Sequence, residues 1–155
     1  MNLSNYFKDK GIGFWFSAVS AILLLISGIL FMVIVPGIDK FIEMAAKWEI
    51  SAGVVTGVGV IAILGAVASI VLIGFKQYKY IGYTQFGFAL VSFLGFVYAS
   101  SKYIFEVFMD IEIHGFATSF VIIMVLFVIT LIVAIANVFL KQTKKVELNE
   151  EVDHE

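Results

Sequence analysis

The sequence predicts an all-α integral membrane protein, a four-helix bundle with a short amphipathic outer helix in its first connection. Of the 155 residues, 61% are hydrophobic and only 14% are charged, whereas soluble domains are about 45–50% apolar and about 25% charged. Four segments carry no charged side chain. Each is long enough to cross the bilayer as a helix, which takes about 20 residues for about 30 Å of hydrocarbon. These segments are residues 11–38, 50–75, 80–101 and 115–140.

The first apolar segment predicts a spanning helix over about 11–35 that is not cleaved off as a signal peptide. The apolar region of a signal peptide has about 7–15 residues, and this segment is much longer. A Pro-Gly pair at 36–37 ends it. When residues 38–50 are wound as a helix, apolar and charged side chains separate onto opposite arcs, and only Glu49 does not fit. This segment is interpreted as an amphipathic helix that lies on the outer leaflet or covers the end of the bundle. An ordinary solvated connection is the alternative.

The remaining helices are expected at about 51–75, 80–114 and 116–141. The connection between the second and third helices is the short stretch KQYKY, so these two helices should be antiparallel neighbours. Residues 1–10 form a cytoplasmic leader in this prediction, residues 11–140 a single four-span domain, and residues 141–155 a charged cytoplasmic tail.

The distribution of lysines predicts the orientation. Seven lysines fall in the leader, the middle connection and the tail, and three fall in the other two connections. The positive-inside rule then places both termini of a multi-pass cell-membrane protein in the cytoplasm. The seven are Lys8, Lys10, Lys76, Lys79, Lys141, Lys144 and Lys145.

Small and weakly polar residues recur on one arc of each helix, as expected where membrane helices pack against each other. The pair Gly53 and Gly57 lies on another side of the second helix, where it leaves room for contact with another chain. The residues predicted to pack are Ser17, Ala21, Gly28, Gly53, Gly57, Ala62, Gly65, Ser69, Ser92, Gly95, Ala99, Thr130 and Asn137.

The stretch KYIFEVFMDIEIHG, residues 102–115, carries three acids and the only histidine outside the C-terminal tail. A continued third helix places Lys102, Glu106, Asp110 and His114 on one face, and Gly115 stands where that helix would end. A strand would instead align Asp110, Glu112 and His114. The functional interpretation of this stripe is an acidic vestibule or a cation site formed by Glu106, Asp110, Glu112 and His114. The simpler interpretation is a solvated helix end in which Lys102 contacts Glu106.

Several classes of function find no support in the sequence. No acid, lysine or histidine falls within the four apolar segments, and ionisable residues at such positions are the usual marks of proton relays and ion-coupled pathways. The chain has no cysteine and none of the common hydrolase, zinc-protease or nucleotide-binding motifs. It also lacks a basic face for nucleic acid. We therefore expect no enzymatic activity, no cofactor and no resident metal.

The element KGIGF at 10–14, after a short basic and aromatic leader, resembles the start of small four-span membrane proteins of low-GC Gram-positive bacteria. The resemblance covers the leader, the first helix and the overall layout. It implies a bacterial membrane protein and brings no activity, ligand or catalytic residue.

The leading functional hypothesis is a non-enzymatic membrane protein that acts through helix–helix contacts, as an accessory subunit or a self-assembling scaffold. Its expected partners are the lipid bilayer and either further copies of itself or another membrane protein. The alternative is a passive channel or facilitator for cations or small solutes, entered through the acidic vestibule. A third hypothesis is an outer-surface sensor built on Asp110, Glu112 and His114.

Overall fold

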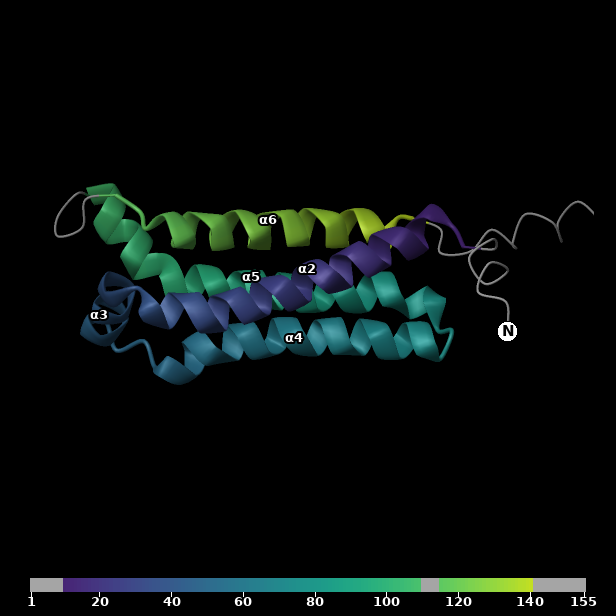
Figure 1. Ribbon diagram of the computed structural model, residues 1–155, viewed down its shortest axis with the longest axis horizontal. Helices are drawn as coiled ribbons and strands as arrows, with labels where there is room; N and C mark the ends of the chain where they lie inside the picture. The colour runs from purple at the N-terminus through teal and green to yellow at the C-terminus, as the bar shows by residue number, and fades with distance from the viewer. Residues whose placement is uncertain (1–9, 110–114, 141–155) are drawn as a thin grey trace, which may run out of the picture.

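The computed structural model describes residues 10–109 and 115–140, which form helices and no strand. The all-helical fold class is therefore confirmed for the described residues. Figure 1 shows the helices α2 (Ile12–Ile34), α3 (Asp39–Lys47), α4 (Ala52–Gly74), α5 (Tyr78–Met109) and α6 (Thr118–Val138), with the short 3-10 helix η1 (Val35–Gly37) after α2.

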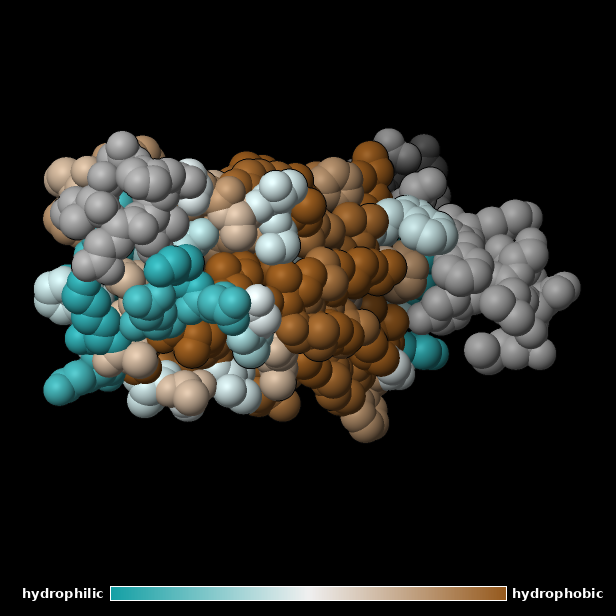
Figure 2. Space-filling model, turned by 60° about the vertical axis from the view of Figure 1, so that its left-hand side comes forward, coloured by the Kyte–Doolittle hydropathy of each residue, from teal (hydrophilic) through white to brown (hydrophobic). Residues whose placement is uncertain are grey.

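Four of these helices are long and apolar enough to cross a membrane. They comprise 26 residues in α2 with η1, 23 in α4, 32 in α5 and 21 in α6. Large apolar side chains remain exposed along all four of them, for example Val33, Ile70, Leu94 and Ile132. Hydrophobic residues cover the middle of the face in Figure 2, whereas hydrophilic residues gather toward one end. A lipid environment would remove this apolar surface from water.

The four long helices lie side by side (Figure 1). Helix α4 packs against α2 and α5, and α6 packs against the same two helices on their other side. Two ends of the molecule are distinguished below. The α3 end carries α3, and the terminal end carries Lys10, the α4–α5 turn and the last turn of α6.

Helix α3 covers the α3 end of the long helices, where it contacts α5. Its side chains Phe41, Met44 and Ala45 are buried, and its four charged side chains are exposed. The residue that did not fit the helical pattern, Glu49, lies just after α3 with a φ of 55°. That left-handed conformation reverses the chain toward α4, whose first turn is capped by Ser51 through a hydrogen bond of 3.4 Å from the Val54 N–H.

Helices α4 and α5 are neighbours, as the short middle connection predicts. Lys76 adopts a left-handed conformation with a φ of 58°. The Gln77 N–H donates to the Leu72 carbonyl over 2.9 Å, which closes the end of α4. The turn thus reverses the chain within three residues, 75–77, and leaves Lys76 exposed at the terminal end.

The described part of α5 ends at Met109, so the predicted continuation of this helix over 110–114 lies outside the described residues. The same holds for the alternative strand. Gly115 has a φ of 85°, a backbone conformation that favours glycine. Farther on, the Ala117 N–H at the start of α6 donates to the Tyr103 hydroxyl over 3.1 Å.

Candidate functional site

Glycines bring α2 and α4 into contact near the middle of the molecule. A methyl group on Gly28 would lie 2.8 Å from the Gly59 carbonyl oxygen, and one on Gly59 would lie 2.8 Å from the Gly28 carbonyl oxygen. Backbone atoms cannot move aside as a flexible side chain can, so larger residues here would force the helices apart. Gly65 plays the same part toward α5, where an added methyl would lie 2.5 Å from Phe88 Cβ.

A polar network joins three helices at the terminal end of the interior. The Gln85 amide donates to the Ser17 carbonyl over 2.7 Å, and the Asn137 amide donates to Ser17 Oγ over 2.8 Å and to Gln85 Oε1 over 2.7 Å. All three residues are buried. Gly82, one turn before Gln85, allows this approach, because an added methyl would lie 3.0 Å from the Asn137 carbonyl oxygen. The network holds α2, α5 and α6 in register.

Other polar side chains in the interior make fewer hydrogen bonds between helices. Ser27 and Thr130 share a hydrogen bond of 3.2 Å between α2 and α6. The buried hydroxyls of Ser20, Ser92 and Ser100 have no hydrogen-bond partner in the described part of the chain. These serines supply small volume for close helix packing.

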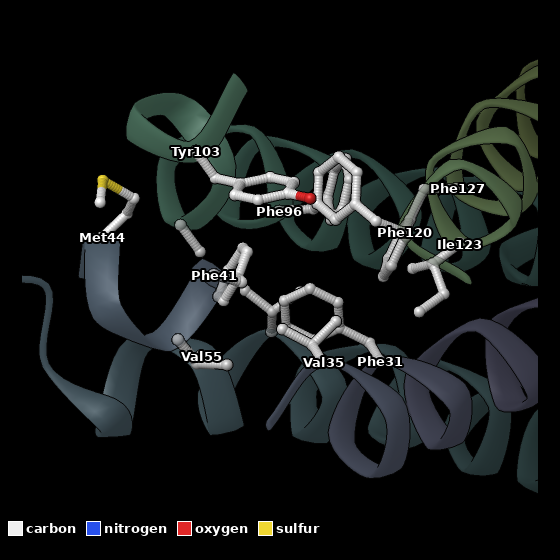
Figure 3. Close-up of a cluster of buried hydrophobic side chains, with 12 residues drawn as sticks. Phe31, Val35, Phe41, Met44, Val55, Phe96, Tyr103, Phe120, Ile123 and Phe127 are labelled. Atoms are coloured by element: carbon white, nitrogen blue, oxygen red, sulfur yellow. The ribbon is translucent and has the colours of Figure 1, made fainter. Parts of the chain in front are cut away.

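Aromatic side chains fill the α3 end of the interior (Figure 3). Phe96 stacks on Phe127 with ring centroids 4.9 Å apart, and Tyr103 meets the edge of Phe120 at 4.9 Å. Phe31 makes edge contacts with Phe96 and Phe127. The rings come from α2, α5 and α6, so they pack this end of the bundle with side chains.

The expected contact between Lys102 and Glu106 does not form. Lys102 Nζ lies 4.2 Å from the centre of the Trp48 ring, a cation–π contact that directs it away from Glu106. The interpretation as a solvated helix end does not hold for Glu106, whose side chain is 5% exposed and whose Oε2 has no hydrogen-bond partner among residues 10–109 and 115–140. The described ion pair at this end joins Lys40 and Glu43 on the surface over 3.0 Å.

The remaining members of the predicted acidic site, Asp110, Glu112 and His114, lie outside the described residues. Within the described ranges, no three histidine, cysteine or acidic side chains gather as metal ligands would. Glu106 therefore stands alone as a described candidate residue.

A groove runs between α4 and α5 on the outer surface of the bundle. Its half nearer the α3 end, here the upper groove, has a volume of about 460 Å³. The other half, the lower groove, has a volume of about 520 Å³. Ile61 and Val91 line both halves, so the two halves adjoin each other. The upper groove is further lined by Val54, Gly57, Val58, Leu94, Gly95 and Tyr98, and the lower by Tyr83, Thr84, Gly87 and Phe88.

Two of the three glycines that line this groove, Gly57 and Gly87, differ from those of the interior, whereas an added methyl on the third, Gly95, would lie 3.0 Å from Val58 Cγ2. An added methyl on Gly57 or Gly87 would meet nothing within 4 Å. On Gly53, one turn before Gly57, it would meet only Ser51 Oγ at 3.6 Å. Packing among the described residues therefore does not require glycine at Gly53, Gly57 or Gly87.

The predicted packing residues fall into two groups. Gly53 is exposed, Gly57 and Gly95 are half-buried at the groove, and the other ten are buried between helices. Sequence patterns missed Gly59 and Gly82, because a glycine within an apolar helix gives no sign of which neighbour it faces. The ten buried residues are Ser17, Ala21, Gly28, Ala62, Gly65, Ser69, Ser92, Ala99, Thr130 and Asn137.

The described structure thus defines a class, an all-helical protein with four helices able to span a membrane, a side-chain-filled interior and a groove on its surface. Comparison of the chain with protein-family models, curated proteins and solved structures finds no match.

Proposed function

We propose that the protein is a non-enzymatic component of the cell membrane that acts through helix contacts along the upper groove. In the first version of this proposal the protein is a self-assembling scaffold, and in the second it is an accessory subunit of another membrane protein. Both termini face the cytoplasm in this proposal, in accord with the distribution of lysines.

The observation that carries the proposal is the spare space at Gly53 and Gly57. Glycine weakens a helix by about 1 kcal/mol relative to alanine, and close packing offsets this cost at Gly28 and Gly59. Among the described residues no contact does so at Gly57, and at Gly53 an added methyl would meet only Ser51 Oγ at 3.6 Å. Two glycines one turn apart on an exposed helix surface are the arrangement that lets a second membrane helix approach the backbone.

The filled interior favours contact over conduction. The Phe96 and Phe127 rings stack across the α3 end, and the amides of Gln85 and Asn137 hydrogen-bond to each other and to Ser17 at the other end. A pore through a single chain would need these groups to separate. The channel alternative would accordingly require a ring of chains around a shared path.

Cysteine cross-linking tests the self-assembling form. The chain has no cysteine, so an introduced cysteine is its only thiol. Leu94 lines the upper groove and is 56% exposed, and Ile132 on α6 provides a matched control at 60% exposed. In native membranes, a short bis-maleimide should link Leu94→Cys chains into dimers and leave Ile132→Cys chains as monomers. Equal linkage at the two positions would overturn self-assembly through this groove.

A further inference from the structure

The lower groove has a different chemical character from the upper one. Its lining is apolar except for the hydroxyl groups of Tyr83 and Thr84. Lys79 lies one helical turn before Tyr83, and Lys76 lies in the turn that precedes α5. Both lysines are exposed. The lower groove therefore ends, toward the terminal end, at two cations.

The charges at the terminal end have one sign within the described residues. The acids Asp39, Glu43, Glu49 and Glu106 belong to α3, the residues after it and the far part of α5, at the α3 end. No described acid stands near Lys76 or Lys79, and no described ion pair includes either lysine. An anionic ligand at this end would meet attraction without a competing carboxylate among these residues.

The path from Lys79 along the lower groove is about as long as one leaflet of a bilayer is thick. The lining of the groove on α5 begins at Tyr83, one turn after Lys79, and ends at Val91, and from Lys79 to Val91 the helix rises about 18 Å at about 1.5 Å per residue. Half of the hydrocarbon core of a bilayer is about 15 Å. Gly87 keeps the middle of this path open, because nothing lies within 4 Å of its added methyl position. An acyl chain whose headgroup lies at the lysines and whose tail follows the groove would end near the middle of the membrane.

We propose that the lower groove binds one anionic phospholipid. Its phosphate lies at Lys76 and Lys79, the Tyr83 hydroxyl is placed to donate to the ester region, and one acyl chain lies over Gly87 against Ile61 and Val91. Charge complementarity and the length of the path favour this occupant over a second helix. The two lysines attract the phosphate of the lipid, whereas they add no attraction for an apolar helix. The site adjoins the helix contact at Gly53 and Gly57, because Ile61 and Val91 line both halves of the groove.

Native mass spectrometry of the purified full chain, titrated with phosphatidylglycerol or phosphatidylcholine, tests this site. The unaltered protein should bind one phosphatidylglycerol more tightly than phosphatidylcholine. Removing both charges in Lys76→Gln/Lys79→Gln should weaken phosphatidylglycerol binding about 25-fold, or about fivefold for each lysine. Gly87→Leu should weaken the binding of both lipids, because its side chain fills the groove.

Two control variants leave the lower groove unchanged. Lys47→Gln alters a lysine at the α3 end, and Gly57→Leu fills the upper groove, so both should bind lipid as the unaltered protein does. Equal phosphatidylglycerol affinity in the double lysine variant would overturn the proposal. Displacement by glycerophosphoglycerol, the headgroup without its tails, at the same concentration as the lipid would overturn it too, because the site would then bind an anion and no acyl chain. Loss of self-assembly in Gly57→Leu bears only on the helix contact.

Discussion

Two glycines on the same helix, Gly59 and Gly57, give the sharpest test of how this chain uses small residues. The substitution Gly59→Ala adds a methyl 2.8 Å from the Gly28 carbonyl oxygen and 2.2 Å from Met32 Cγ. The methionine can turn away, but the carbonyl belongs to a helix backbone and can yield only if α2 and α4 separate. The matched substitution Gly57→Ala adds the same methyl where nothing lies within 4 Å.

The difference between the two variants isolates the steric cost. Both exchanges gain the same helix propensity, up to about 1 kcal/mol, so this contribution cancels when one is subtracted from the other. Overpacking a close contact typically costs about 1–3 kcal/mol. In single chains, where no second helix packs against Gly57, we expect Gly59→Ala to be less stable than Gly57→Ala by that amount. Under the same condition we expect Gly57→Ala to be at least as stable as the unaltered protein.

Equilibrium unfolding in mixed bicelles, followed by circular dichroism as denaturing detergent is added, measures this difference. Gly28→Ala should repeat the effect of Gly59→Ala from the opposite helix, because the two contacts are reciprocal. Equal stability of Gly59→Ala and Gly57→Ala would refute the distinction between interior and groove glycines, and with it the physical basis for a contact at Gly57.

The same unfolding assay tests three further contacts. Asn137→Leu should cost about 1–2 kcal/mol, because it removes two donated hydrogen bonds and leaves buried acceptors behind, whereas Ser92→Ala, which removes an unpartnered hydroxyl, should cost less. Phe96→Ala should cost about 3–5 kcal/mol through the cavity left among the stacked rings; a loss below that of Ser92→Ala would contradict the packing described. Tyr103→Phe should cost about 1 kcal/mol by removing the acceptor of the Ala117 N–H, and exposed Tyr98→Phe should show no change if that bond is the cause.

The class of fold follows directly from the sequence, because its physical cause is local. A continuous apolar run of about 20 residues can satisfy its backbone in lipid only as a helix, so four such runs predict four spans without knowledge of their contacts. The short middle connection likewise determines the pairing of α4 with α5. These features depend on composition and chain length, which the sequence displays.

The details of the site depend on which residues meet, and one sequence does not contain that information. The prediction for Lys102 assumed its helical neighbour Glu106, whereas Trp48, 54 residues earlier in the chain, offers the ring that it contacts. Glu106 falls on the same face of α5 as the buried residues Ser92 and Ala99, and the structure shows that this face stays buried as far as Glu106. Gly59 and Gly57 look alike in the sequence, and only the position of α2 distinguishes them.

Mass analysis of native-lipid particles tests the central claim most directly. The tagged protein and its Gly57→Leu variant would be extracted from their own membranes, with chain copies and co-purifying proteins counted in each particle. We expect a second chain, either a copy of this protein or one other membrane protein in fixed ratio, and its loss in Gly57→Leu. Particles that hold a single chain without a partner, or a second chain that Gly57→Leu retains in full, would contradict a function through helix contacts along the upper groove.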